Sequence, residues 1–260
     1  MMKDALNAFA AQSGVQAALM AARGFTGPAG VFEAPGGLWA QLDSPAHVEL
    51  LGSDLGQPFR ITRCGFKDYR YSAVAWSHPA IEALLFLREA HRLDASNVKS
   101  IHVRTIRRAT VHIGTQPVEP GFGRLDTQFN GPYIFAAALK FGDVSPSRQG
   151  RAKDPDIQRL SRCVTIEADE ELGRDFPKTF PAVVTVTTRE GRRLEHRIDQ
   201  RRGDPGNPLS DADIEAKFRA LAARRLSSSR VRAVIEAVWS LEGCEDINRL
   251  TELFSPEQRS

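Results

Sequence analysis

Residues 181–198, PAVVTVTTREGRRLEHRI, decide the fold class of this 260-residue chain. The segment is rich in β-branched residues and carries a Glu-Gly pair at 190–191, a combination that predicts two strands joined by a turn. The chain therefore contains a sheet, and the segments on either side of this hairpin show what surrounds it.

Upstream of the hairpin, strand and helix patterns follow one another without strict alternation. Further strands are predicted at 59–71 (FRITRCGFKDYRY), 98–105 (VKSIHVRT) and 163–169 (CVTIEAD). Helices are predicted at 77–93 with Ser77 as the cap, at 129–144 with a proline in the first turn, and at 154–162. This mixture predicts an α+β fold for residues 58–203.

Both ends of the chain have helical patterns instead. Between Ala8 and Ala22, eleven of fifteen residues are apolar, which predicts a helix buried among other helices and stopped by Gly24. Further short helices are predicted at 31–42 and 44–56. After a linker at 199–213, with Ser210 as a cap, three helices are predicted at 211–226, 227–243 and 245–254.

The predicted organisation is an α+β lid inserted into a partial all-helical domain. Residues 1–57 form a segment of the helical domain, residues 58–203 form the lid, and residues 204–260 return to the helical domain. Because 1–57 has too few apolar residues for a core of its own, we expect the larger part of the helical domain to lie outside this sequence.

Composition narrows the classes of function. Charged residues make up 26% of the chain, hydrophobic residues 42%, and the net charge is +3, so no nucleic-acid partner is predicted. The basic run at 189–203 lacks interleaved aromatic residues and is interpreted as a solvated face. Polar residues interrupt Ala5–Ala22, so neither a membrane span nor a signal peptide is expected. Three scattered cysteines indicate no metal site and a reducing, cytoplasmic setting.

No P-loop, dinucleotide fingerprint, GxSxG or HExxH motif occurs. The remaining candidates are cationic and proton-transferring groups near predicted element boundaries: Lys3, Arg63, Lys67, Tyr69, His78 and Tyr133. Aromatic neighbours could desolvate Lys67 for acid/base work or anion binding, or the lysine could simply extend to solvent. His78, at a helix start, suits a neutral base, but a structural role there is equally common.

Four segments in register resemble the MmgE/PrpD family: 3–28 (KDALNAFAAQSGVQAALMAARGFTGP), 66–88 (FKDYRYSAVAWSHPAIEALLFLR), 127–144 (TQFNGPYIFAAALKFGDV) and 203–222 (GDPGNPLSDADIEAKFRALA). The resemblance covers essentially the whole chain. It implies a helical domain with an inserted α+β lid and an active site in the cleft between them. It also implies that the family's N-terminal helical half is absent from this sequence.

The resemblance implies a lyase that needs no cofactor or metal and acts on a small di- or tricarboxylic acid such as 2-methylcitrate or cis-aconitate, by dehydration or decarboxylation, as in propionate catabolism. Lys3, Lys67 and His78 are the implied catalytic residues. Lys3 and Lys67 are also expected to bind substrate carboxylates, with Arg63 and Tyr69 beside them.

The alternative is a truncated or split family member that is inactive alone and serves as a subunit or binding module. The expected macromolecular partner is a second copy of the chain in a homodimer or a complementing N-terminal half. Nucleic acid and membranes are not expected partners.

Overall fold

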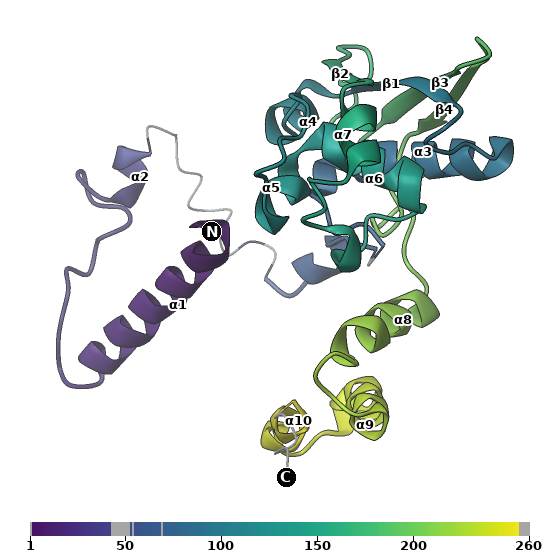
Figure 1. Cartoon of the computed structure of the whole chain (residues 1–260). Helices are drawn as coiled ribbons and strands as arrows, with labels where there is room; N and C mark the ends of the chain where they lie inside the picture. Colours follow the sequence, from purple (N-terminus) through teal and green to yellow (C-terminus); the bar gives the residue numbers. More distant parts are fainter. Residues whose placement is uncertain (1, 43–52, 54, 69, 255–260) are drawn as a thin grey trace. The chain divides into compact units, whose positions relative to one another are not determined.

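The computed structural model describes residues 2–42, 53, 55–68 and 70–254, without the side chains of residues 2–4, 60 and 63. These residues belong to two compact units, Met1–Arg63 and Cys64–Ser260 (Figure 1). The second unit contains helices and a four-stranded mixed sheet, so the predicted α+β fold is confirmed.

The first unit is dominated by one long helix. Its elements are α1 (Met2–Ala21), α2 (Leu38–Gln41) and the 3₁₀ turn η2 (Arg60–Arg63). The chain leaves α1 through Gly24, whose φ of +86° favours glycine, and the Phe25 N–H donates to the Met20 carbonyl at 3.1 Å. The helix and its glycine stop are therefore confirmed. The helix predicted at 44–56 lies largely outside the described residues.

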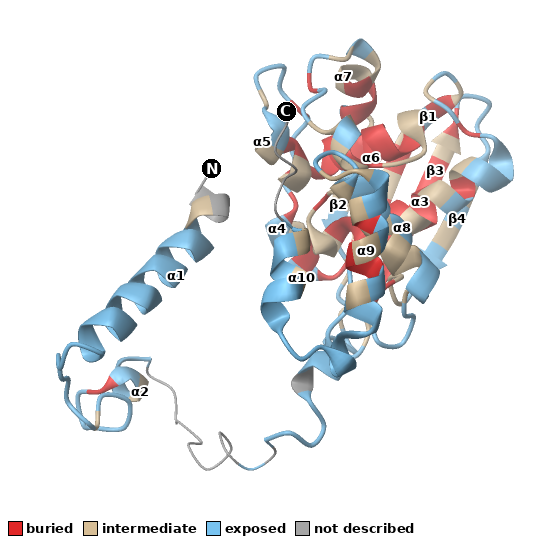
Figure 2. Ribbon diagram, turned by 90° about the horizontal axis from the view of Figure 1, so that it is seen from below, coloured by how far each residue is buried: buried red, intermediate tan, exposed pale blue. Residues whose placement is uncertain are grey.

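The burial predicted for α1 is not found within this unit. Four large apolar side chains along the helix are more than half exposed, namely those of Leu6, Phe9, Val15 and Leu19. Figure 2 shows the described length of α1 almost entirely in the colour of exposed residues. The apolar-rich pattern predicted the helix correctly, but none of the described elements of the unit covers its apolar surface.

The second unit contains the remaining elements. Its helices are η3 (Ala75–Ser77), α3 (His78–His91), α4 (Arg107–His112), α5 (Arg124–Phe129), α6 (Gly131–Phe141), η4 (Pro146–Arg148), α7 (Pro155–Ser161), α8 (Asp211–Ala222), α9 (Ser228–Trp239), η5 (Leu241–Gly243) and α10 (Ile247–Leu253). Its strands are β1 (Val98–Thr105), β2 (Val164–Ala168), β3 (Ala182–Thr188) and β4 (Arg193–Ile198). All predicted helices of this region are found, and α4 and α5 were not predicted.

The strands lie in the order β2-β1-β3-β4. β1 pairs in parallel with β2 and antiparallel with β3, while β3 and β4 form the predicted hairpin around Gly191, whose φ is +87°. Successive residues of β3 point to opposite faces of the sheet. Val184 and Val186 therefore join the main core, whereas Val183 joins a smaller cluster with Ile106 on the other face.

The strand predicted at 59–71 is wrong. Arg60–Arg63 form η2, the Phe66 N–H makes a backbone bond to the Gly203 carbonyl at 2.7 Å, and Tyr71 forms an isolated bridge with Val144. The aromatic and β-branched content that suggested a strand instead supplies a core contact, because the Tyr71 side chain is buried in the main cluster.

Two helices pack with the sheet to form the main core. α3 contacts β3, β4 and α6, and α6 is buried along most of its length (Figure 2). Asn130 caps α6 by accepting a bond from the Tyr133 N–H at 2.8 Å, and Pro132 occupies the first turn as predicted. Ser77 precedes α3 as predicted, but its hydroxyl donates to the Val74 carbonyl instead of accepting a bond from the helix.

The chain continues from β4 through the linker into α8, α9 and α10. Ser210 caps α8 in a reciprocal arrangement with Asp213, which confirms the predicted cap. Among the described residues, no helix combines the length and apolar character needed to cross a bilayer.

Candidate active site

Lys67 and His78 converge on one backbone carbonyl. The Lys67 ammonium donates to the Ala73 oxygen at 3.4 Å, and the His78 Nε2 lies 3.3 Å from the same oxygen. Lys67 lies in an irregular segment before α3, and His78 is the first residue of that helix. The turn that contains Ala73 therefore joins the two residues that the sequence placed at the site.

The surroundings of His78 determine its tautomer. A carbonyl oxygen can only accept, so Nε2 carries the hydrogen and Nδ1 carries the lone pair. His78 is fully buried, and Nδ1 has no hydrogen-bond partner among the described residues. Burial lowers the pKa of His78 to about 3, with a further contribution from the Arg201 charge, so the ring is neutral at physiological pH.

Tyr71 forms the wall beside the His78 ring. The two rings meet edge to face with their centroids 5.2 Å apart. Burial raises the pKa of the Tyr71 hydroxyl, which therefore stays protonated. The contact restricts rotation of the imidazole and holds its bond to Ala73.

Next to Lys67, Asp68 anchors a cluster of charged side chains. Asp68 is 4% exposed and binds the Arg70 guanidinium at 2.7 Å and the Arg202 guanidinium at 3.1 Å. Burial alone would raise the pKa of Asp68, but the hydrogen bonds and charge of Arg70, with that of Arg202, lower it. Arg202 also binds Asp213 of α8 at 2.5 Å.

A cavity of about 220 Å³ lies beside this cluster. Its walls come from the Lys67 segment, the linker and α8, and are formed by Asp68, Arg70, Arg202, Leu209, Asp213 and Ala216. The charged groups around it are paired with one another, so the cavity presents ion pairs and not a single sign of charge.

Glu82, one turn into α3, completes the cluster. One of its carboxylate oxygens accepts the backbone N–H of Arg202 at 2.9 Å. Burial raises the pKa of Glu82 to about 7, and the negative charge of Asp68 adds to the rise. The hydrogen bond from the Arg202 N–H lowers the pKa but does not offset the effect of burial. Glu82 therefore changes its protonation state near neutral pH.

A tight crossing of two segments places Arg201 near His78. Arg201 pairs with Asp204 at 2.6 Å, and a Cβ at Gly65 would lie 2.6 Å from the Asp204 carboxylate. Gly203 has a φ of +97°, and a side chain there would collide with the Phe66 carbonyl. Glycines at these two positions allow the linker to approach the Lys67 segment.

The structure brings together Lys67 and His78, and it places Tyr133 elsewhere. The side chains of Lys3 and Arg63, and the whole of Tyr69, lie outside the described residues. Tyr133 is buried in α6, where its hydroxyl bonds to the Arg148 carbonyl. The assignments of Lys3, Arg63 and Tyr69 therefore stay predictions.

The sequence interpretation missed Arg201 and Arg202. Both belong to the basic run at 189–203, which was interpreted as a solvated face, yet the Arg201 side chain is only 13% exposed and Arg202 is 34% exposed. The partners Asp68 and Glu82 of Arg202 are distant in sequence, so composition alone could not reveal them. The nearest signal was the Gly203-Asp204-Pro205 turn, which makes a close crossing possible.

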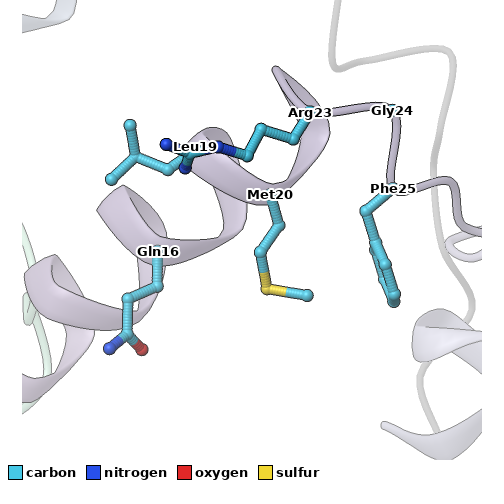
Figure 3. A pocket seen from close by; sticks show the side chains of 6 residues that line it. All are labelled: Gln16, Leu19, Met20, Arg23, Gly24 and Phe25. Atoms are coloured by element: carbon cyan, nitrogen blue, oxygen red, sulfur yellow. The ribbon is translucent and has the colours of Figure 1, made fainter.

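A second pocket, in the first unit, differs from this charged cluster. Gln16, Leu19, Met20, Arg23, Gly24 and Phe25 line it at the end of α1 (Figure 3). Its lining is mostly apolar with one arginine, so it contains no pair of side chains that could act as acid and base. Within the described part of the chain, no three histidine, cysteine, aspartate or glutamate side chains converge as a metal site requires.

The fold and the site together define an α+β domain with a buried histidine at the start of its first core helix and a lysine in the segment before that helix. A family model described as the MmgE/PrpD C-terminal domain matches residues 71–242. This chain therefore belongs to the MmgE/PrpD family, as the sequence resemblance indicated.

Curated relatives extend the match beyond those residues. The chain is 28% identical over 278 residues to a cis-aconitate decarboxylase-like protein, oryM, of Aspergillus oryzae, covering 99% of this chain and 55% of that protein. It is 24% identical to the cis-aconitate decarboxylase of Aspergillus terreus, covering 98% and 55%. The human cis-aconitate decarboxylase matches at 32% over 47% of this chain. The chain spans about half the length of the Aspergillus relatives.

Proposed function

We propose that this chain carries the lid and part of the helical domain of an MmgE/PrpD-type lyase that acts on a small di- or tricarboxylic acid. The observation that carries the proposal is the shared contact of Lys67 and His78 with the Ala73 carbonyl. The names of the Aspergillus relatives support decarboxylation of cis-aconitate as the first reaction to test. Dehydration of a 2-methylcitrate-like acid is the second.

In this proposal Lys67 serves as carboxylate clamp or acid. Its side chain is exposed and its bond to the Ala73 oxygen is long, at 3.4 Å, so a substrate carboxylate can compete with that oxygen for the ammonium. Loss of carbon dioxide beside a carboxylate leaves a carbanion, which an adjacent ammonium group stabilises by charge and protonates as a donor. Cationic stabilisation of this kind requires neither cofactor nor metal.

His78 orients the site in this proposal. The ring is fully buried and neutral, and its N–H is engaged by Ala73, all of which favours orientation of the Lys67 turn over direct contact with substrate. Lys3, Arg63 and Tyr69 are proposed to complete the carboxylate-binding surface.

The proposed partners are a second copy of the chain or a polypeptide equivalent to the N-terminal helical half of the relatives. The exposed apolar side chains of α1 support this. Sedimentation of the purified chain, alone and with such a polypeptide, tests it: a compact monomer in both cases contradicts the proposal. A cytoplasmic setting is also proposed, since Cys163 and Cys244 are free cysteines and thus suited to a reducing compartment.

The decisive experiment measures turnover of cis-aconitate, 2-methylcitrate and citrate by the chain, with and without the complementing polypeptide. Release of carbon dioxide reports decarboxylation, and the change in ultraviolet absorbance of the double bond reports dehydration. Turnover that depends on the chain supports the lyase. Absence of turnover with every acid, in both arrangements, contradicts it and favours the alternative of a binding module.

A further inference from the structure

Arg202 connects three elements around the Lys67 segment. Its guanidinium binds Asp68 through Nη1 at 3.1 Å and Asp213 through Nη2 at 2.5 Å, and its backbone N–H donates to Glu82 at 2.9 Å. One residue of the linker therefore contacts the residue after Lys67, the first turn of α8 and α3. Such a bidentate bridge suits arginine because its planar guanidinium presents several donors in fixed directions.

α8 reaches the Lys67 segment a second time. The Lys217 ammonium donates to the backbone carbonyl of Lys67 at 2.8 Å. Lys217 lies four residues after Asp213, so both side chains extend from one face of the helix. Lys217 thus fixes residue 67 directly, and Asp213, one helical turn earlier, fixes residue 68 through Arg202.

The first turn of α8 is itself held in place. The Ser210 hydroxyl and backbone both bond to the Asp213 carboxylate, at 2.6 and 3.0 Å, so that carboxylate has a fixed position before it meets Arg202. The buried Asp68 is likewise held by Arg70, which chelates it through Nε and Nη2. Neither end of the bridge is a freely moving surface group.

We propose that Arg202 and Lys217 are positioning residues that hold the backbone at Lys67 so that its ammonium stays at the Ala73 and His78 site. The importance of Lys67 rests on the proposed function, but the positioning itself is a property of this chain. Small displacements of a reacting group reduce turnover strongly, and a side chain held by supporting contacts keeps its geometry.

The test compares the chemical reactivity of individual lysines in the 260-residue chain. The variants are Lys217→Met, which removes the bond to the Lys67 carbonyl; Lys217→Arg, which keeps a donor; and Arg202→Lys, which keeps the charge but loses the planar guanidinium whose Nη1 and Nη2 reach Asp68 and Asp213. Arg219→Met, elsewhere on α8, is the matched control. Thermal unfolding verifies the fold of each variant, and competitive acetylation read by mass spectrometry gives the rate at Lys67 relative to Lys99 of β1.

Release of the segment frees the Lys67 amine from its bond to Ala73. Lys217→Met and Arg202→Lys are therefore expected to raise acetylation at Lys67 by roughly fivefold, the effect of losing about one net hydrogen bond. Lys99 keeps its rate, and Lys217→Arg and Arg219→Met behave as wild type. An unchanged Lys67 rate in the folded Lys217→Met variant, or an equal rise at Lys99, overturns the positioning role.

Turnover separates this inference from the proposed function. If an acid is turned over, Lys217→Met is expected to lower kcat by roughly tenfold or more with KM little changed, because position and not binding is lost. Unchanged kcat in that variant overturns the positioning role even when the lyase is active. A selective change at Lys67 without turnover of any acid leaves the positioning role standing while the proposed function fails.

Discussion

Lys67 and His78 share the carbonyl oxygen of Ala73, at 3.4 and 3.3 Å. Lys67 is exposed, and His78 is fully buried. The histidine therefore fixes the oxygen, and the oxygen limits where the lysine amine rests when no substrate is bound. This arrangement predicts different consequences for changes at the two residues.

Lys67→Ala is expected to abolish lyase turnover while leaving the fold intact, because the side chain is exposed and its removal creates no cavity. Loss of one charge-stabilising group lowers kcat by roughly a hundredfold or more. Steady-state kinetics measure the effect, and circular dichroism verifies the fold. Lys99→Ala, at an exposed position of β1, is the control. Wild-type turnover by the Lys67→Ala variant would contradict the assignment of Lys67 to the site.

His78 should make the folded state sensitive to acid. Its folded pKa of about 3 lies below the ordinary value of 6.5, so its contribution to stability is complete above pH 6.5 and declines as the pH falls toward 3. The variant His78→Phe keeps a ring against Tyr71. Its melting temperature is expected to fall less between pH 7 and pH 5 than that of the wild type. His91→Phe, at the exposed end of α3, controls for the change of ring. Equal pH dependence in wild type and His78→Phe contradicts the assignment.

Glu82 has the opposite effect. Its pKa rises from 4.5 to about 7 on folding, so its contribution is complete below pH 4.5 and declines as the pH rises through 7. The penalty above that pH is at most about 3 kcal/mol. Glu82→Gln keeps the acceptor for the Arg202 N–H without the charge, and is expected to raise the melting temperature at pH 8 but not near pH 4.5. Glu89→Gln, exposed on α3, should show no such difference; a gain that is the same at both pH values would contradict the role of the buried charge.

Gly203→Ala is expected to destabilise the fold by about 1–3 kcal/mol, because it adds backbone strain and a collision with the Phe66 carbonyl. Urea unfolding measures the loss. Gly191→Ala is the matched control, since Gly191 has a similar positive φ but open space around it. If the two variants lose the same stability, the close crossing at Phe66 contributes nothing.

Local patterns predicted most of the fold correctly. The β3–β4 hairpin, the amphipathic α3 and the buried α6 each follow from short-range periodicity and turn chemistry, which are properties of neighbouring residues. The strand expected at 59–71 failed because strand propensity describes a residue that fits a half-buried surface, and Tyr71 meets that condition without a ladder.

The candidate site could be predicted only in part. Lys67 and His78 lie in one short segment and were predicted from it, but the acceptor that joins them is a backbone oxygen, which carries no residue signature. The sequence assigned Arg202 to a solvated face, because its carboxylate partners Asp68 and Glu82 lie more than a hundred residues earlier in the chain. Pairings at that separation depend on tertiary structure.

The hydrogen bond between Phe66 and Gly203 also marks where the chain enters and leaves the sheet-bearing region. Because Phe66 and Gly203 are neighbours, the chain enters and leaves this region at one place. A linker that joins these two positions can be short, so it costs little loop-closure entropy. Excision of the region between Phe66 and Gly203 therefore needs only a short linker, and it also removes the contacts that Lys67 and Arg202 make with α8.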